Sequence, residues 1–184
     1  SVVAPPGGSE AVIGTNPIAM TVPGSGGPVM HFDFSTSAVA LGKITMAKAS
    51  GTEIPLGWAL DSNGQPTTDP VEALSGTLVS TGGYKGWGFG LMSEIFASGV
   101  TGSVNSLDIK GLKSPEGKPH GIGQYYIIID THTYSDLFTQ RFGRVADAVK
   151  KQGGARIPGA SRIKLDVIDV PDELWDIVLK LVNR

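Results

Sequence analysis

The sequence predicts a mixed α/β domain that is not built from regular βαβ units. Segments typical of strands alternate with stretches of helical apolar spacing, but the expected strands lie at irregular intervals. No G-x-G-x-x-G follows a strand and opens a helix, so a Rossmann dinucleotide site is not expected. The 184 residues suffice for one well-packed domain or for one lobe of a larger enzyme.

The expected elements follow from hydrophobic spacing and from start and stop signals. The run from Gln124 to Asp130 is the clearest strand, because it is continuous, aromatic and β-branched. The hydroxyls of residues 35–37 are good N-caps for a helix that should end at Gly51. In order, we expect a strand at residues 29–34, a helix at 38–49, turns at 51–55 and 61–66, a buried glycine-rich helix at 86–99, a strand at 124–130, a helix with an apolar face at Phe138, Phe142, Val145 and Val149, and a last helix from about Pro171 with a buried stripe at Leu174, Ile177, Val178 and Leu181.

Composition and charge exclude several functional classes. The net charge is -2 and no run of Lys or Arg exceeds two residues, which argues against nucleic acid or an anionic membrane surface as a partner. No apolar stretch approaches the roughly 20 residues that span a bilayer. The absence of Cys rules out disulfides and fits a reducing, cytoplasmic compartment. Because the chain lacks both an initiator Met and a signal peptide, we expect it to begin inside a longer gene product.

Two segments in the first part of the chain carry polar groups suited to a ligand. Gly14-Thr15-Asn16-Pro17 places a hydroxyl and an amide before a proline, which disfavours helix at Asn16. In Asp33-Phe34-Ser35-Thr36-Ser37, a carboxylate at a strand end precedes hydroxyls at an expected helix start. The carboxylate could accept from a ribose, and helical N–H groups could donate to an oxyanion. A capped turn and a simple N-cap are the alternative interpretations.

Two further segments carry positive charge next to glycine or proline. In Gly82-Gly83-Tyr84-Lys85-Gly86, the glycines allow close backbone approach and the ammonium could neutralise a phosphate or carboxylate. In the segment from residue 156 to 162, two arginines border a rigid turn that could clamp an anion. A solvated lysine and a basic surface loop are the alternatives. The three histidines lack metal-ligand spacing, so no metal site is expected.

Taken together and in order, these stretches resemble the type 2 malate/L-lactate dehydrogenase family, also called L-sulfolactate dehydrogenase-like oxidoreductases. The resemblance covers essentially the whole chain. The matching stretches are residues 14–20, 33–37, 42–44, 64–70, 82–86, 156–159 and 170–175.

The resemblance implies an NAD- or NADP-dependent oxidoreductase that interconverts a small 2-hydroxy acid of the malate or lactate type and its 2-oxo acid. It implies a non-Rossmann fold, in which the dinucleotide lies on a largely antiparallel sheet with flanking helices. Thr15 matches a position that touches substrate. The positions that match cofactor contacts are Asp33, Phe34, Ser35, Tyr84, Lys85, Arg156, Pro158, Gly159, Ser161 and Arg162.

The resemblance also implies that the chain is incomplete as a catalyst. Family members are nearly twice as long, and their acid/base His lies in an N-terminal portion that this chain lacks. We therefore expect residues 1–155 to form the cofactor-binding domain, and residues 156–184 to form a closing loop and a C-terminal helix that packs on the N-terminal complement. The family also implies a homodimer.

The specificity of the chain stays open in two respects. Asp33 could favour the free ribose of NAD, whereas Arg156 or Arg162 could pair with the 2′-phosphate of NADP. The branch of the family that reduces cyclic imino acids carries an Asp where this chain has Lys43, which favours hydroxy-acid chemistry. For the function of the whole chain, a non-catalytic dinucleotide-binding module is an alternative to both enzyme activities.

Overall fold

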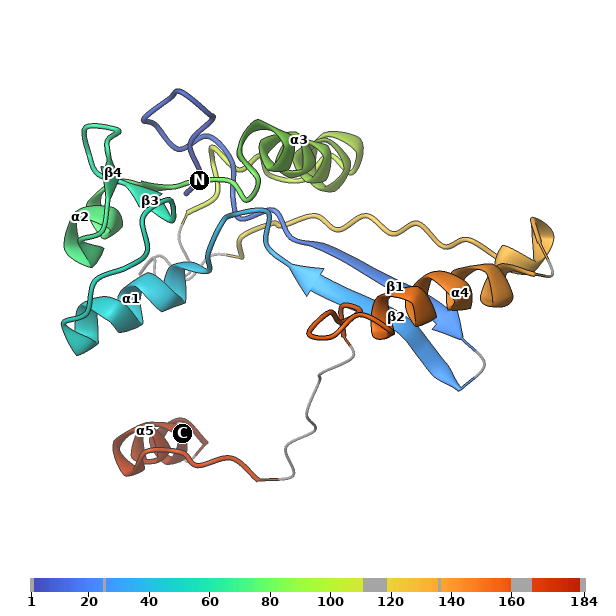
Figure 1. The fold of residues 1–184 in the computed structure, drawn as a ribbon. Coiled ribbons are helices and arrows are strands. Elements are labelled where there is room, and N and C mark those ends of the chain that lie inside the picture. The colour runs from blue at the N-terminus through green and yellow to red at the C-terminus, as the bar shows by residue number, and fades with distance from the viewer. Residues whose placement is uncertain (1, 25, 111–118, 136, 160–166, 183–184) are drawn as a thin grey trace.

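The computed structural model has a mixed α/β fold, and it describes residues 2–24, 26–110, 119–135, 137–159 and 167–182. All strand pairs are antiparallel in these ranges, and helices flank them, as the sequence predicts (Figure 1). The elements in chain order are β1 (Ile18–Gly24), β2 (Gly27–Phe34), α1 (Leu41–Ser50), β3 (Ala59–Leu60), β4 (Pro66–Thr67), α2 (Pro70–Ser75), β5 (Thr77–Leu78), α3 (Gly83–Glu94), the π-helical η1 (Ile95–Val100), the 3-10 turn η2 (Thr131–Thr133), α4 (Phe138–Lys150) and α5 (Asp172–Val182).

The longest strands form the hairpin β1–β2, in which Ile18 pairs with Phe34 and Gly24 with Gly27. The strand expected at residues 29–34 is confirmed and begins two residues earlier. Its partner β1 directly follows Gly14-Thr15-Asn16-Pro17 and was not predicted from the sequence. The hairpin carries the Asp33 segment to the end of β2.

The core lies between α1, α2 and the small sheet ordered β4–β3–β5. Ile44 of α1 is 0% exposed, and Val3 and Leu78 are 1% exposed. Helix α1 ends at Gly51 in the left-handed conformation, as expected. Its start was predicted three residues too early. The N-cap is Ala40, which makes no side-chain hydrogen bond.

The hydroxyls of residues 35–37 do not cap α1, which corrects the sequence prediction. The Thr36 hydroxyl donates to the carbonyls of Thr15 and Asn16 at 3.1 and 3.2 Å. The Ser37 hydroxyl donates to the Val39 carbonyl at 2.8 Å and to the Ser35 hydroxyl at 3.0 Å. These hydrogen bonds stabilise the bends between β2 and α1. The hydroxyls therefore bond to residues 15 and 16 and within the connecting segment, and they do not cap the helix.

The glycine-rich helix begins at Gly83, three residues earlier than predicted, so Tyr84 and Lys85 lie in its first turn instead of in a loop. Gly82 is the N-cap and has a left-handed conformation with φ 60 and ψ 25. After Glu94 the α-helix continues as the π-helical η1. Only part of α3 is buried, notably Gly86 and Gly90.

The strand expected at residues 124–130 is wrong as an assigned strand. The segment is extended in Figure 1, but no hydrogen-bonded partner strand lies beside it within the described ranges. Its apolar side chains are exposed, with Ile128 at 94% and Tyr126 at 76%. β propensity alone therefore does not produce a strand here, because a strand also requires a neighbour to satisfy its backbone.

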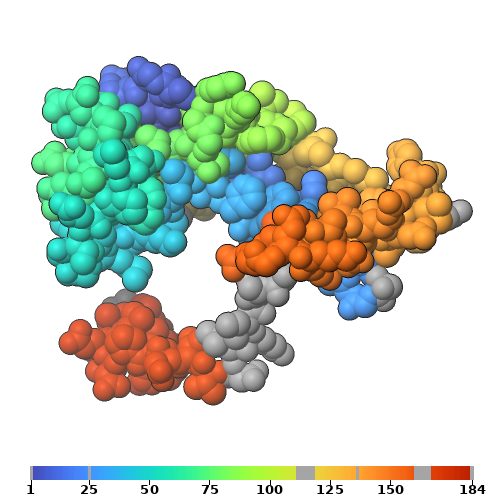
Figure 2. All heavy atoms as spheres, in the orientation of Figure 1, coloured from blue at the N-terminus to red at the C-terminus, as the bar shows by residue number. Residues whose placement is uncertain are grey.

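The two C-terminal helices form where the sequence predicts them, but their apolar faces differ from expectation. In α4, Ala146 is buried and Val145 is 55% exposed. Helix α5 begins at Asp172, and its predicted buried stripe is exposed, with Ile177 at 55% and Leu181 at 62%. Figure 2 shows α5 in red, separated from the body of the molecule by an open space. The amphipathic spacing predicts this helix correctly, but no described element covers its apolar face.

Candidate functional site

Three of the four predicted segments meet at Thr36. The Thr36 amide donates to the Thr15 carbonyl at 2.8 Å, and its hydroxyl donates to the same oxygen at 3.1 Å. The Thr81 amide donates to the Thr36 carbonyl at 2.9 Å, immediately before the Gly82–Gly86 segment. Because Thr36 is only 3% exposed, these bonds form a buried junction. The junction fixes the Thr15 loop, the end of β2 and the start of α3 relative to one another.

The end of β2 presents the residues expected at a ribose. Asp33 is exposed, and the Phe34 ring is half exposed and stacks on Phe32 with 4.8 Å between ring centroids. Ser35 is partly buried, and its hydroxyl accepts from Ser37. Helix α1 begins only at Leu41, so the free helical N–H groups expected directly after Ser35 are not found there. Uncapped helical N–H groups lie instead at the start of α3.

The first turn of α3 is open to solvent. Tyr84 is 72% exposed, and the Lys85 ammonium lies 6.0 Å from the centroid of the Tyr84 ring. The N-cap Gly82 has no side chain to occupy the free N–H groups of this turn. A Cβ on Gly83 would meet no atom within 4 Å. The turn therefore offers unshielded backbone donors, a helix dipole and one ammonium.

The fourth segment lies against β2 at His31. The His31 amide donates to the Pro158 carbonyl at 3.1 Å, and a Cβ on Gly159 would come within 2.6 Å of the His31 carbonyl oxygen. Ile157 is buried, whereas Arg156, Pro158 and Gly159 are exposed. The turn therefore contacts β2 two residues before Asp33. Ser161 and Arg162 lie outside the described residues.

Sequence reasoning missed a polar cluster behind the Thr15 loop. Glu94 accepts from the Asn16 side-chain amide at 2.9 Å and from the Ser106 backbone amide at 2.8 Å, and it also accepts from the Ser106 hydroxyl. Partial burial raises the pKa of Glu94, but the hydrogen bonds from Ser106 and Asn16 outweigh it, so the pKa lies below the usual 4.5. A signal existed, since Glu94 is the one acidic residue in the sequence from 83 to 100.

The described part of the chain holds neither a candidate metal site nor a membrane-spanning helix. No group of three or more His, Asp or Glu side chains there could hold a metal ion. Among the same residues, none of the helices is both long enough and apolar enough to cross a membrane.

The profile of the malate/L-lactate dehydrogenase family matches residues 1–167. The chain belongs to this family. The (2R)-3-sulfolactate dehydrogenase (NADP(+)) of Chromohalobacter salexigens is 36% identical over 181 residues, which cover 96% of this chain and 54% of that protein. The Δ1-pyrroline-2-carboxylate reductase of Ancylobacter novellus is 39% identical over 166 residues, covering 87% of this chain and 48% of that protein.

Solved structures of the family confirm the fold. The sulfolactate dehydrogenase from Methanocaldococcus jannaschii superimposes with a TM-score of 0.85 at 31% identity, covering 99% of this chain and 56% of that one. The Δ1-piperideine-2-carboxylate reductase from Pseudomonas syringae pvar. tomato gives a TM-score of 0.84 at 31% identity, covering 98% and 57%. The chain thus spans about half the length of these relatives.

Proposed function

We propose that this chain is the cofactor-binding part of an NAD(P)-dependent oxidoreductase that interconverts a small 2-hydroxy acid and its 2-oxo acid. The Thr36 junction carries the proposal, because it brings the exposed carboxylate of Asp33 and the open start of α3 into one unit. These are the two kinds of group that hold a nucleotide, one for the sugar hydroxyls and one for the phosphates.

The described residues fit a dinucleotide by their chemistry. Asp33 would accept from a ribose hydroxyl, and the N–H groups at the start of α3 would donate to phosphate oxygens together with Lys85. The half-exposed Phe34 and the exposed Tyr84 would cover apolar faces of the cofactor, and Arg156 would face a phosphate. When bound, the nicotinamide would supply or accept the hydride. Thr15 would contact the substrate beside it.

Reduction of a ketone also needs a proton donor at the carbonyl oxygen, and we propose that an N-terminal segment of the gene product supplies it as a His. Two exposed apolar surfaces support a covering segment. One is the extended run of Ile127, Ile128 and Ile129, and the other is the apolar stripe of α5. The same surfaces would serve a homodimer. The division at residues 155 and 156 into a cofactor-binding domain and a closing segment belongs to this proposal.

The substrate class has two candidates. Lys43 favours a 2-oxo acid, because it replaces the Asp that the imine-reducing branch carries. A cyclic imino acid is the second candidate, and the 39% identity to a pyrroline-2-carboxylate reductase favours it. Both substrates carry a carboxylate next to the carbon that receives the hydride, so one pocket chemistry could serve either.

The test is an assay of the chain with the N-terminal segment of its gene product, joined or mixed. NADH and NADPH consumption is followed with pyruvate, oxaloacetate, sulfopyruvate, Δ1-pyrroline-2-carboxylate and Δ1-piperideine-2-carboxylate. We expect turnover of a 2-oxo acid that exceeds turnover of either imine. Turnover of the imines alone would select the second candidate. Cofactor binding without any turnover would instead identify a non-catalytic dinucleotide-binding module.

A further inference from the structure

The Thr15 loop is held in an unusual backbone conformation. Asn16 has a φ of 38, and it is the one non-glycine residue with positive φ among those the structure describes. Asn tolerates this region better than most residues, but the conformation persists only where surrounding contacts enforce it. Asn16 therefore needs a specific restraint, and its side chain shows which one.

The restraint comes from the end of α3. The Asn16 side-chain amide donates to the Gly90 carbonyl at 3.0 Å and to the Glu94 carboxylate at 2.9 Å. Ser106 is 4% exposed, and it donates to Glu94 from its backbone and its hydroxyl. The α-helix changes to a π-helix directly after Glu94, and such irregularities are frequent at functional sites.

We propose that Glu94 is a positioning residue, which holds Asn16 and thereby fixes Thr15 for contact with the substrate. The inference rests on the proposed function, since it assigns Thr15 to the substrate. The chain of contacts is short. Glu94 binds the Asn16 side chain, and the carbonyls of Thr15 and Asn16 each accept from the Thr36 hydroxyl. Loss of the restraint would displace Thr15 without altering the cofactor residues at the start of α3.

The donor count explains why a carboxylate is required. Three donors converge on Glu94: the Asn16 amide, the Ser106 backbone N–H and the Ser106 hydroxyl. A Gln at this position has one acceptor oxygen and an NH₂ group that only donates. At least one donor would therefore face another donor in Glu94→Gln.

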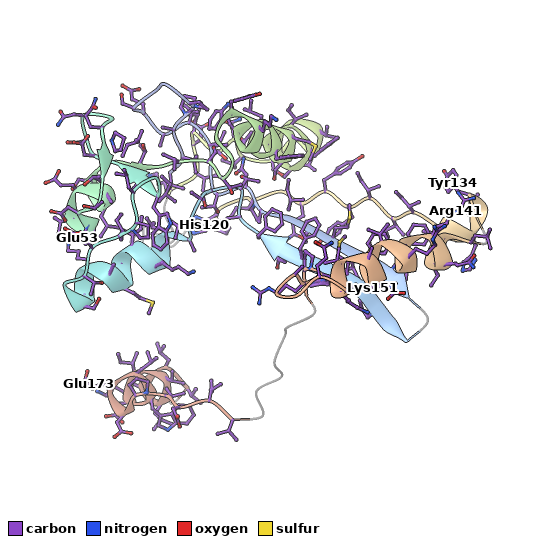
Figure 3. All side chains as sticks on the ribbon, viewed as in Figure 1. Glu53, His120, Tyr134, Arg141, Lys151 and Glu173 are labelled. Atoms are coloured by element: carbon purple, nitrogen blue, oxygen red, sulfur yellow. The ribbon has the colours of Figure 1, made fainter. Side chains whose placement is uncertain are left out.

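The experiment compares Glu94→Gln with Glu53→Gln in the complete enzyme. Glu53 is exposed, and Glu53→Gln removes the same charge as Glu94→Gln. Figure 3 shows Glu53 on the α1–α2 side of the molecule, away from α3. Kinetic constants are measured for the preferred substrate and for NAD(P)H, and each preparation is corrected for its folded fraction. Hydrogen exchange of the Thr36 and Ser106 amides reports the loop directly, without any need for turnover.

We expect Glu94→Gln to lower kcat/KM for the substrate by about 10- to 100-fold, because small misplacements near the chemistry have effects of this size. The KM for NAD(P)H should change less than about threefold, on the same reasoning that only the substrate contact moves. Glu53→Gln should match wild type, and exchange at Thr36 should accelerate in Glu94→Gln.

Equal losses for substrate and cofactor would overturn the positioning role and leave Glu94 as a general stabiliser of α3. Unchanged exchange at Thr36 in Glu94→Gln would overturn it as well. If the wild-type enzyme is inactive with every substrate, the proposed function fails, and the exchange result alone decides whether Glu94 holds the Thr15 loop.

Discussion

Replacement of Gly86 by Ala should damage the start of α3 more than any neighbouring glycine substitution of the same kind. An ideal Cβ on Gly86 would lie 1.5 Å from the Thr81 carbonyl oxygen, about 2 Å closer than ordinary contact. No side-chain rotation relieves a clash with backbone, so the first turn of α3 or residues 81–83 must move. Thr81 is tied to Thr36, so movement there would disturb the junction.

The matched control lies two residues further along the same helix. A Cβ on Gly88 would meet nothing within 4 Å, and Gly88 is exposed. Gly88→Ala should therefore raise the free energy of unfolding by roughly 0.5–1 kcal/mol through helix propensity. Gly86→Ala should lower it by about 3 kcal/mol, the upper end for overpacking. The two variants should thus differ by about 3.5–4 kcal/mol, or roughly 7–16 °C in Tm for a chain of this size.

Urea unfolding followed by tryptophan fluorescence, to which the half-buried Trp87 beside Gly86 contributes, measures the difference. Calorimetric titration with NADH and NADPH should show weaker binding for Gly86→Ala by at least about tenfold and little change for Gly88→Ala, because Lys85 belongs to the displaced turn. Equal stability of the two variants would refute the close approach of α3 to Thr81.

Three further predictions concern the cofactor residues, the core and the acid limit. Lys85→Ala should weaken the binding of both dinucleotides by about 10- to 100-fold, the usual range for a hydrogen bond to a charged group. Asp33→Ala should weaken the binding of NADH more than that of NADPH. Calorimetry that shows no change in affinity for either variant would contradict the assignment. Ile44→Ala should lower the free energy of unfolding in urea by about 2–5 kcal/mol, because Ile44 is fully buried. Met46→Ala, at a residue that is 72% exposed, should lower it by less than about 0.5 kcal/mol. Similar losses in the two variants would contradict the position of the core. The pKa of Glu94 is lowered on folding, so its carboxylate contributes stability above its usual pKa of 4.5 that is lost as pH falls through the lowered value. Stability measured between pH 6 and 3 should therefore fall more steeply in wild type than in Glu94→Gln, and parallel curves would contradict the hydrogen-bonded carboxylate.

Local signals in the sequence were sufficient for several elements. The β2 strand, the stop of α1 at Gly51 and the amphipathic helices α4 and α5 follow from residue pattern and capping chemistry. The predictions that failed depend on partners distant in sequence. The segment of residues 124–130 has strand chemistry but no partner strand in the described chain, and the α5 stripe is apolar but uncovered.

The same distinction applies to the candidate site. The sequence singled out Asp33, Lys85 and Gly159 as ligand-type residues, but it could not reveal that Thr36 joins the segments of Asp33 and Lys85, because a threonine after a strand is also a good helix cap. The bond between Asn16 and Glu94 spans 78 positions, and no local pattern indicates such a separation. The fold class and the residue types are therefore local properties, whereas the junction and its restraint are tertiary ones.

We propose that the end of β2, the start of α3 and the turn before residue 160 form one dinucleotide site. Hydrogen exchange with and without saturating NADH or NADPH tests it directly, because each segment is observed separately in one experiment. We predict that the cofactor slows exchange at residues 33–36, 82–86 and 156–159 together, while residues 172–182 remain unchanged. Binding that protects only one of the three segments, or none of them, would contradict the claim.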